Sequence, residues 1–279
     1  MPDFINYING VWELASKSNV PLYDAGFLLG DGLFETIRFQ NRQLFRCEKH
    51  LERLLSGLDL IRINLKKTTS EITTLLEEII HKNTLETGLL RLMVTRGLVE
   101  GPPWKYDGPS GIYISIRPLT PSVENPVKVV FYSEEKYPII RFNPAIKSLN
   151  YIGNMLAKKD AENDGAFEPV FYNNDGFITE CAIRNIFFIR GNTLLTPSTQ
   201  LGVLPGVMRD TIMSISVKFN LTINETNISL KSINEMDEAF ISSTGIGLLP
   251  CTWDGWQSNF IITTKIKKHL DLSINNNSL

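Results

Sequence analysis

Turn signals between short apolar runs constrain the fold of this chain more than any other feature. Asn9-Gly10, Asn173-Asn-Asp-Gly176 and Gly191-Asn192 each separate two runs that suit β-strands. These turns accept the positive φ angles that tight hairpins need. Leucines and isoleucines also recur at helical spacing within about 48–60 and 69–82. The pattern therefore predicts an α/β protein that contains several hairpins.

The segment 118–126 is the strongest linker candidate, because it carries three prolines among polar residues. It predicts a small N-terminal α/β domain over 1–117 and a larger C-terminal domain over 127–279. The 279 residues are 43% hydrophobic, which is enough to bury a sizeable core. In the second half we expect helices near 151–163 and 207–219.

Charge and composition exclude several classes of function. The net charge is −2 and no basic stripe is visible, so we expect neither nucleic acid nor an anionic membrane as a partner. No apolar run approaches the roughly 20 residues of a membrane span. The three cysteines and three histidines are scattered and show no metal spacing. Since a signal peptide is also not evident, we expect a cytoplasmic protein without a metal.

Lys147 is the one charged residue in the segment Ala145-Ile-Lys-Ser-Leu-Asn-Tyr151, which follows Pro144. Such a lysine is either a buried, reactive amine or a surface side chain that buries only its stem. The segment by itself does not decide between these alternatives.

Three further features can be considered with this lysine. Glu180 lies at the end of a predicted strand, Gly206 precedes a predicted helix, and Ser242-Ser-Thr-Gly245 ends another strand. Each also has an ordinary explanation as a solvated rim residue, a helix start or a turn. A helix start and a hydroxyl-rich turn suit a phosphate. Together, an amine, a carboxylate and two anion-binding turns match the needs of pyridoxal 5'-phosphate.

The order of the motifs resembles the class IV (fold type IV) pyridoxal-phosphate enzymes over about residues 4–250. This family includes branched-chain and D-amino acid aminotransferases, (R)-amine transaminases and aminodeoxychorismate lyase. The matching segments are Gly30-Asp-Gly-Leu-Phe-Glu-Thr-Ile-Arg38, His50-Leu-Glu-Arg53, Arg91, Thr95-Arg-Gly97, Lys147-Ser-Leu-Asn150, Thr179-Glu-Cys181, Asn185-Ile-Phe187, Thr196-Pro197, Pro205-Gly-Val-Met-Arg209 and Ser243-Thr244.

The resemblance implies a two-domain fold with a pseudo-barrel C-terminal domain, and roles for individual residues. Lys147 would hold the cofactor as a Schiff base and move the substrate proton, Glu180 would pair with the ring nitrogen, and Arg53 would bind the phosphate. The implied cofactor-binding residues are Arg53, Lys147, Tyr151, Glu180, Val207, Met208, Ser243 and Thr244. The implied substrate-binding residues are Phe34, Thr36, Arg38, Arg91, Arg96 and Gly245.

The resemblance favours a ping-pong aminotransferase that acts on an L-branched-chain or D-amino acid and a 2-oxo acid. Arg38, Arg91 and Arg96 compete as the carboxylate-binding residue, and each could instead form a structural ion pair. Aminodeoxychorismate lyase, which eliminates pyruvate, is the first alternative, and a non-catalytic cofactor-binding relative is the second. The family also implies a homodimer whose active site lies near the subunit interface.

Overall fold

The computed structural model describes residues 3–102, 104–105, 108–119 and 126–276. The chain divides into two compact units, Met1–Thr120 with Ile146–Asn150, and Pro121–Ala145 with Tyr151–Leu279. Residues 120–125 of the predicted linker 118–126 lie outside the described part of the chain. The predicted second domain differs in one respect, because 146–150, which includes Lys147, packs with the first unit.

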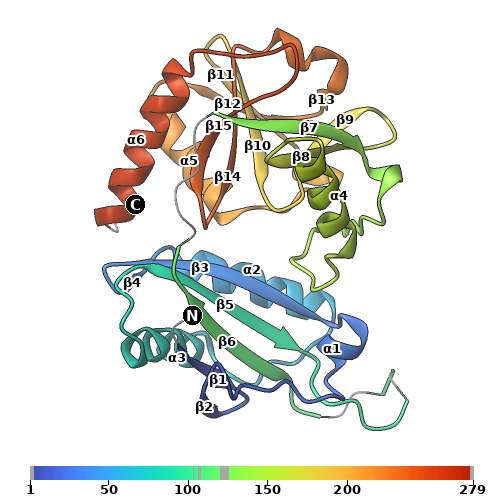
Figure 1. Ribbon diagram of the computed structural model, residues 1–279, viewed down its shortest axis with the longest axis vertical. Helices are drawn as coiled ribbons and strands as arrows, with labels where there is room; N and C mark the ends of the chain where they lie inside the picture. Colours follow the sequence, from blue (N-terminus) through green and yellow to red (C-terminus); the bar gives the residue numbers. More distant parts are fainter. Residues whose placement is uncertain (1–2, 103, 106–107, 120–125, 277–279) are drawn as a thin grey trace. The chain divides into compact units, whose positions relative to one another are not determined.

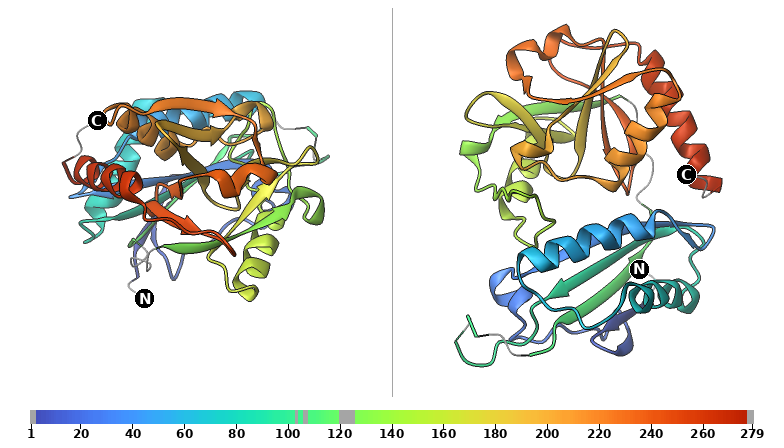
Figure 2. Two further views of the ribbon diagram at one scale, coloured as in Figure 1. Left: turned by 90° about the horizontal axis from the view of Figure 1, so that it is seen from above. Right: turned by 180° about the vertical axis from the view of Figure 1, so that it is seen from behind.

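The first unit is an antiparallel sheet of six strands in the order β2-β1-β6-β5-β3-β4. Helices α2 and α3 cover one face of this sheet, and their leucines and isoleucines share one core with β3, β5 and β6 (Figures 1 and 2). Its elements are β1 (Ile5–Ile8), β2 (Val11–Leu14), α1 (Ala25–Leu29), β3 (Gly32–Gln40), β4 (Gln43–Leu44), α2 (Cys47–Leu60), α3 (Thr69–Lys82), β5 (Gly88–Thr95) and β6 (Gly111–Arg117).

The second unit is a mixed sheet of nine strands in the order β12-β11-β10-β14-β15-β7-β8-β9-β13. Strands β9 and β13 near one end of this order also contact β11, so the sheet curls into a barrel-like form. Its strands are β7 (Val127–Ser133), β8 (Glu168–Tyr172), β9 (Phe177–Cys181), β10 (Asn185–Arg190), β11 (Thr193–Pro197), β12 (Thr222–Thr226), β13 (Ile228–Ser229), β14 (Glu238–Ser243) and β15 (Gly247–Thr252).

Three α-helices cover the outside of the second sheet. Helix α4 (Ile152–Asn163) packs against β7 and β8, whereas α5 (Val207–Val217) and α6 (Ile261–Asn276) lie side by side along β14 (Figure 1). Three short 3-10 helices, 134–136, 199–201 and 230–235, complete the unit. The apolar side chains of β7–β10, β14 and β15 fill the interior of the curled sheet.

The predicted hairpins are confirmed. Asn9 and Gly10 have φ angles of 47° and 100°, which match the tight turn that joins β1 to β2. The two later turns join β8 to β9 and β10 to β11. The predicted helix over 69–82 is also confirmed, and Thr68 and Glu71 form a capping box at its start.

In the part of the chain that the structure describes, no helix is both long enough and apolar enough to cross a membrane.

Candidate active site

Lys147 is anchored to the first unit through its backbone. The N–H of Phe34 donates to the Lys147 carbonyl at 3.0 Å, and the N–H of Leu149 donates to the Gly32 carbonyl at 3.0 Å. Residues 147–149 therefore pair with the start of β3. The side-chain nitrogen of Lys147 lies 4.5 Å from the centroid of the buried Phe34 ring. Its amine is therefore held over one aromatic face.

Asn150 ties the lysine segment to the glycine-rich turn before β3. Its Nδ2 donates to the carbonyl of Gly30 at 3.0 Å and to Oγ of Ser148 at 2.8 Å. Gly30 ends α1 with a φ of 67°, a conformation that glycine adopts without strain. Two motifs that are about 120 residues apart in the sequence therefore form one local structure.

Arg53 on α2 is held by a buried carboxylate on β3. Its Nε donates to Oε1 of Glu35 at 2.7 Å, and its Nη2 donates to Oε2 at 2.7 Å. The Nδ1 of His50, one helical turn earlier on α2, lies 2.7 Å from the same Oε2. This two-bond geometry fixes the plane of the guanidinium group of Arg53.

The protonation states in this cluster follow from burial and charge. Burial alone raises the pKa of Glu35, but the charges of Arg53 and His50 and their hydrogen bonds outweigh it and lower the pKa to about 2. Burial lowers the pKa of His50, and the cations Arg53 and Lys147 act in the same direction, against Glu35. At neutral pH, an ionised Glu35 therefore accepts the Nδ1–H of a neutral His50.

The face of β3 opposite α2 carries several predicted substrate residues. Alternation along the strand places Phe34, Thr36 and Arg38 on this face, and Thr36 is paired with Arg91 on β5. The guanidinium carbon of Arg91 lies 3.9 Å from the Phe34 ring centroid. Lys147 and Arg91 therefore contact the same aromatic ring.

Arg96 occupies a different environment. Its Nε donates to Asp31 at 2.7 Å, and its Nη1 and Nη2 donate to the carbonyls of Arg62 and Ile61, both at 2.8 Å. These contacts tie the start of β3 to the loop after α2. They match the structural ion pair that the sequence left open for this arginine.

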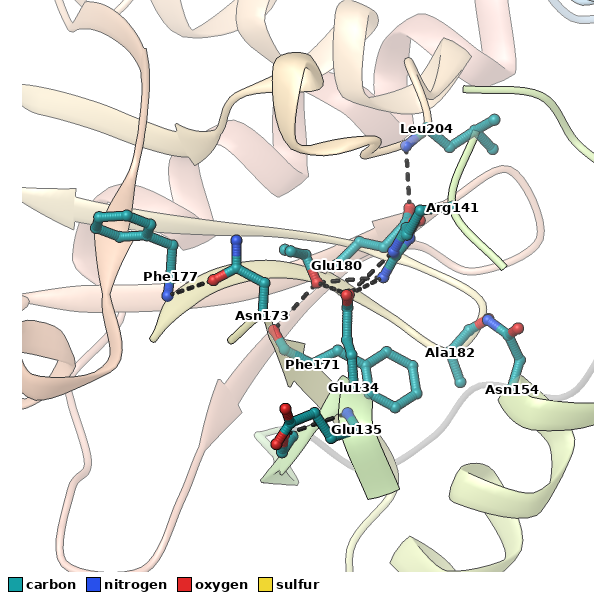
Figure 3. A network of polar contacts seen from close by, with 12 residues as sticks. Glu134, Glu135, Arg141, Asn154, Phe171, Asn173, Phe177, Glu180, Ala182 and Leu204 are labelled. Carbon is teal, nitrogen blue, oxygen red and sulfur yellow. Dashed lines mark hydrogen bonds and ion pairs between the residues drawn. The ribbon is translucent and has the colours of Figure 1, made fainter. Parts of the chain in front are cut away.

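Glu180 is the carboxylate of the second unit, at the end of β9. One of its oxygens accepts a bond from Nη1 of Arg141, and the other accepts the N–H of Leu204 at 3.3 Å (Figure 3). The side chain of Glu180 is mostly buried, with 15% of its surface exposed. The sequence placed Glu180 at a strand end but assigned no role to Arg141.

The loop before α5 links Glu180 to the start of that helix. The Nδ2 of Asn185 donates to the carbonyl of Leu204 at 3.0 Å. Gly206 occupies the N-cap of α5 and provides no side-chain cap. The predicted N–H donors Val207 and Met208 therefore form the first turn of α5, where the helix dipole favours an anion.

The remaining predicted residues also lie in the second unit. Ser243 ends β14, and Thr244 and Gly245 form the turn to β15. Ser242 lies opposite Asn185 in the sheet, so this strand end neighbours the loop that precedes α5. Tyr151 precedes α4, and its carbonyl accepts the N–H of Met155 at 3.0 Å.

The structure thus forms two sets of site residues, one in each unit. The first set is arranged around Phe34 and Glu35 on β3, and the second around Glu180 and the start of α5. Four polar residues that orient these sets were not predicted from the sequence as site residues. Glu35 and His50 lay inside quoted motifs, whereas no local signal marked Glu134 or Arg141 as partners of a site carboxylate.

The donors in the two sets fit pyridoxal 5'-phosphate. Lys147 provides an amine and Arg53 provides an oriented guanidinium group, while Glu180 provides a carboxylate. A Cβ atom on Gly206 would lie only 2.1 Å from Oδ1 of Asn185, so the approach to the first turn of α5 needs glycine.

Comparisons with known proteins agree with this chemistry. The family model described as amino-transferase class IV matches residues 32–252. The chain is 30% identical over 245 residues to a D-alanine aminotransferase of Listeria monocytogenes, with 84% of this chain and 82% of the relative covered. It is 28% identical over 255 residues to an aminodeoxychorismate lyase of Bacillus subtilis, with 88% and 85% covered.

Solved structures show the same fold. A branched-chain aminotransferase from Thermoproteus uzoniensis, solved with norvaline, superposes with a TM-score of 0.90 at 22% sequence identity. The match covers 98% of this chain and 95% of that protein. The two-sheet architecture is therefore that of the fold type IV enzymes, as the sequence predicted.

Proposed function

Because the chain belongs to the class IV aminotransferase family, we propose that it is a pyridoxal-phosphate-dependent aminotransferase. It moves the amino group of an amino acid to a 2-oxo acid in two half-reactions. The observation that carries this proposal is the position of Lys147. Its amine lies over the ring of Phe34, which precedes Glu35 on β3, and Glu35 binds Arg53 of α2. The cofactor, when bound, provides the electron sink for breaking the substrate Cα–H bond.

The residues of this chain bind the cofactor and transfer the proton. Lys147 holds the cofactor covalently and moves a proton at the substrate Cα. Arg53, oriented by Glu35, binds the phosphate, and the N–H groups at the start of α5 bind it as well. We assign the ring nitrogen to Glu180. The predicted contributions of Tyr151, Ser243 and Thr244 stay with this proposal as further contacts to the cofactor.

We infer that Arg91 or Arg38 binds the substrate carboxylate. Arg91 contacts the Phe34 ring, which Lys147 also contacts, and Arg38 lies on the same face of β3 as Phe34. Arg96 is the weaker candidate, because Asp31 and two backbone carbonyls occupy its guanidinium group. The arrangement suits an amino acid as the substrate, with an L-branched-chain or a D-amino acid as the two options.

Aminodeoxychorismate lyase is a second candidate function, favoured by the similarity to the Bacillus subtilis relative. The lyase reaction would use the same lysine and carboxylate, but it ends with elimination of pyruvate. A cofactor-binding protein without catalysis is a third option. The presence of both Lys147 and Glu180 argues against that option.

We further propose that the protein is a homodimer. Large apolar side chains on and beside α1 are exposed, and Tyr23 and Phe27 are each 65% accessible. Contiguous exposed apolar surface of this kind marks an interaction site. Light scattering at micromolar concentration should give the mass of two chains.

All three cysteines are free thiols, which suits a reducing compartment and supports a cytoplasmic location.

A single-turnover spectral assay tests the function. The purified protein, loaded with pyridoxal 5'-phosphate, is mixed separately with D-alanine, L-leucine, D-glutamate and 4-amino-4-deoxychorismate. Loss of the cofactor absorption band with an amino acid, and its recovery on addition of a 2-oxo acid, would support an aminotransferase. Release of pyruvate from aminodeoxychorismate, without any change with the amino acids, would instead make the protein the lyase.

Lys147→Ala is the matched test of the lysine. This variant should lose the covalent link to the cofactor. In the wild type, mass spectrometry after borohydride reduction should detect that link at one residue. Arg91→Lys is a useful companion, because it keeps the charge and leaves Lys147 intact. A cofactor adduct that persists at another lysine in the Lys147→Ala protein would contradict the assignment.

A further inference from the structure

Glu180 does not stand alone in the second unit, because it belongs to a cluster of three charged side chains. Arg141 bonds to Glu180 through Nη1 and to Oε1 of Glu134 through Nε at 2.9 Å and Nη2 at 2.5 Å (Figure 3). Each of the three side chains exposes no more than 20% of its surface. A single guanidinium group therefore bridges two mostly buried carboxylates.

Neighbouring polar groups fix the geometry of this cluster. Oγ1 of Thr179 donates to Glu134 at 2.6 Å and accepts from Nη2 of Arg141 at 3.2 Å. The N–H of Leu204 holds the second oxygen of Glu180. Every oxygen of Glu180 thus has a partner on a different segment of the unit, so its orientation is set by the fold rather than by solvent.

The charges in the cluster do not cancel. Burial lowers the pKa of Arg141, but Glu180 and Glu134 outweigh burial and raise it, so Arg141 stays cationic. Two carboxylates and one guanidinium group leave a single net negative charge. If Glu134 were absent, Arg141 would neutralise Glu180, and the site would present no net charge to a cation.

Other charged groups near β9 do not supply this negative charge. Glu168 on β8 is paired with Arg184 and accepts the N–H of Ile183 at 3.0 Å. The thiol of Cys181 follows Glu180, and burial raises its pKa well above its usual value, so it remains neutral. Among the described residues, Glu134 is thus the acid that shares the guanidinium group of Arg141 with Glu180.

We propose that Glu134 and Arg141 are positioning residues for Glu180: Arg141 orients its carboxylate, and Glu134 supplies the extra negative charge that lets Glu180 hold a protonated ring nitrogen. The inference rests on the proposed function, since it needs the cofactor ring beside Glu180. Glu134 and Arg141 would act on the protonation of the ring nitrogen through Glu180.

The test measures the ring nitrogen directly. Pyridoxal 5'-phosphate labelled with ¹⁵N in the ring is bound to the full-length protein, and its ¹⁵N chemical shift is followed against pH. Glu134→Gln should lower the midpoint of ring protonation by about one pH unit, because a neighbouring negative charge is lost. Glu134→Asp keeps the charge and should restore the midpoint to near the wild-type value.

Glu135→Gln is the matched control. Glu135 is the next residue of the same 3-10 helix, and its side chain is exposed to solvent. The same change of charge should therefore be screened by water and leave the midpoint nearly unchanged. Equal midpoints in Glu134→Gln and Glu135→Gln would overturn the inference while the proposed function stands. A wild-type protein that gives no bound ¹⁵N signal would overturn the proposed function and the inference together.

Discussion

The substitution Glu35→Gln tests how the first unit orients the guanidinium group of Arg53. The carboxylate is fully buried between α2 and β3, and it receives two bonds from Arg53 and one from His50. Glu35→Gln keeps the shape of the side chain but removes its charge. The fall of the Glu35 pKa from 4.5 to about 2 corresponds to roughly 3 kcal/mol of unfolding free energy at neutral pH.

The pH dependence has a defined sign. Because the folded-state pKa of Glu35 is depressed, its stabilisation is fully present above about pH 4.5 and is lost as the pH falls towards about 2. The advantage of the wild type over Glu35→Gln should therefore be constant from pH 7 to about 4.5 and shrink below that. Wild-type stability should also decline below about pH 6.5, because only the unfolded state readily protonates His50.

The assay compares the cofactor-free proteins in urea, with amide hydrogen exchange of residues 32–40 reporting on the first unit separately. Glu52→Gln is the control, since Glu52 is an exposed neighbour on α2 that pairs with Lys49 at the surface. Its substitution should cost less than about 1 kcal/mol. The reasoning would be refuted if Glu35→Gln lowered the free energy of unfolding as little as Glu52→Gln does. It would also be refuted if the difference between wild type and Glu35→Gln did not shrink at low pH.

Two further predictions concern the loop before α5 and the start of α1. Gly206→Ala should weaken binding of pyridoxal 5'-phosphate by about tenfold, because the new Cβ would lie 2.1 Å from Oδ1 of Asn185 and displace the first turn of α5; fluorescence titration measures this, and unchanged affinity would exclude that turn from the phosphate site. Asp24→Ala should lower the unfolding free energy by about 2–4 kcal/mol, because Asp24 caps α1 and accepts bonds from Thr95 and Tyr113 at 2.8 and 2.7 Å. Urea unfolding measures this value, and a decrease in unfolding free energy below about 1 kcal/mol would contradict the predicted contribution of the buried Asp24 network.

Local patterns were sufficient for most of the elements. The leucine spacing of α2, the capping box of α3 and the hairpin turns depend on residues within a few positions of one another. The sequence pattern did not predict α6, because its buried positions include the polar residues Thr263 and Ser273, which interrupt the apolar face of the helix. It also did not predict α1, a helix of only five residues after Asp24.

The candidate site was predictable only as a set of residue types. Lys147, Glu180 and Arg53 were identified because their motifs occur in a characteristic order. The sequence left three arginines in competition. The structure pairs Arg96 with Asp31 and two backbone carbonyls, and it places Arg91 against the Phe34 ring. Such contacts depend on side-chain direction, which residue spacing does not specify.

The sequence by itself determined the family and the periodicity of the main elements, and it singled out Lys147 as the candidate reactive lysine, because these depend on residue identity and on short-range spacing. Only the tertiary structure decided that the Lys147 segment pairs with β3 rather than with its sequence neighbours. It also decided that Glu35 orients Arg53, and that Glu134 and Arg141 share the charge of Glu180. The physical reason is that buried charges select partners by proximity in the fold, and these charged partners lie 7 to 39 residues apart in the chain.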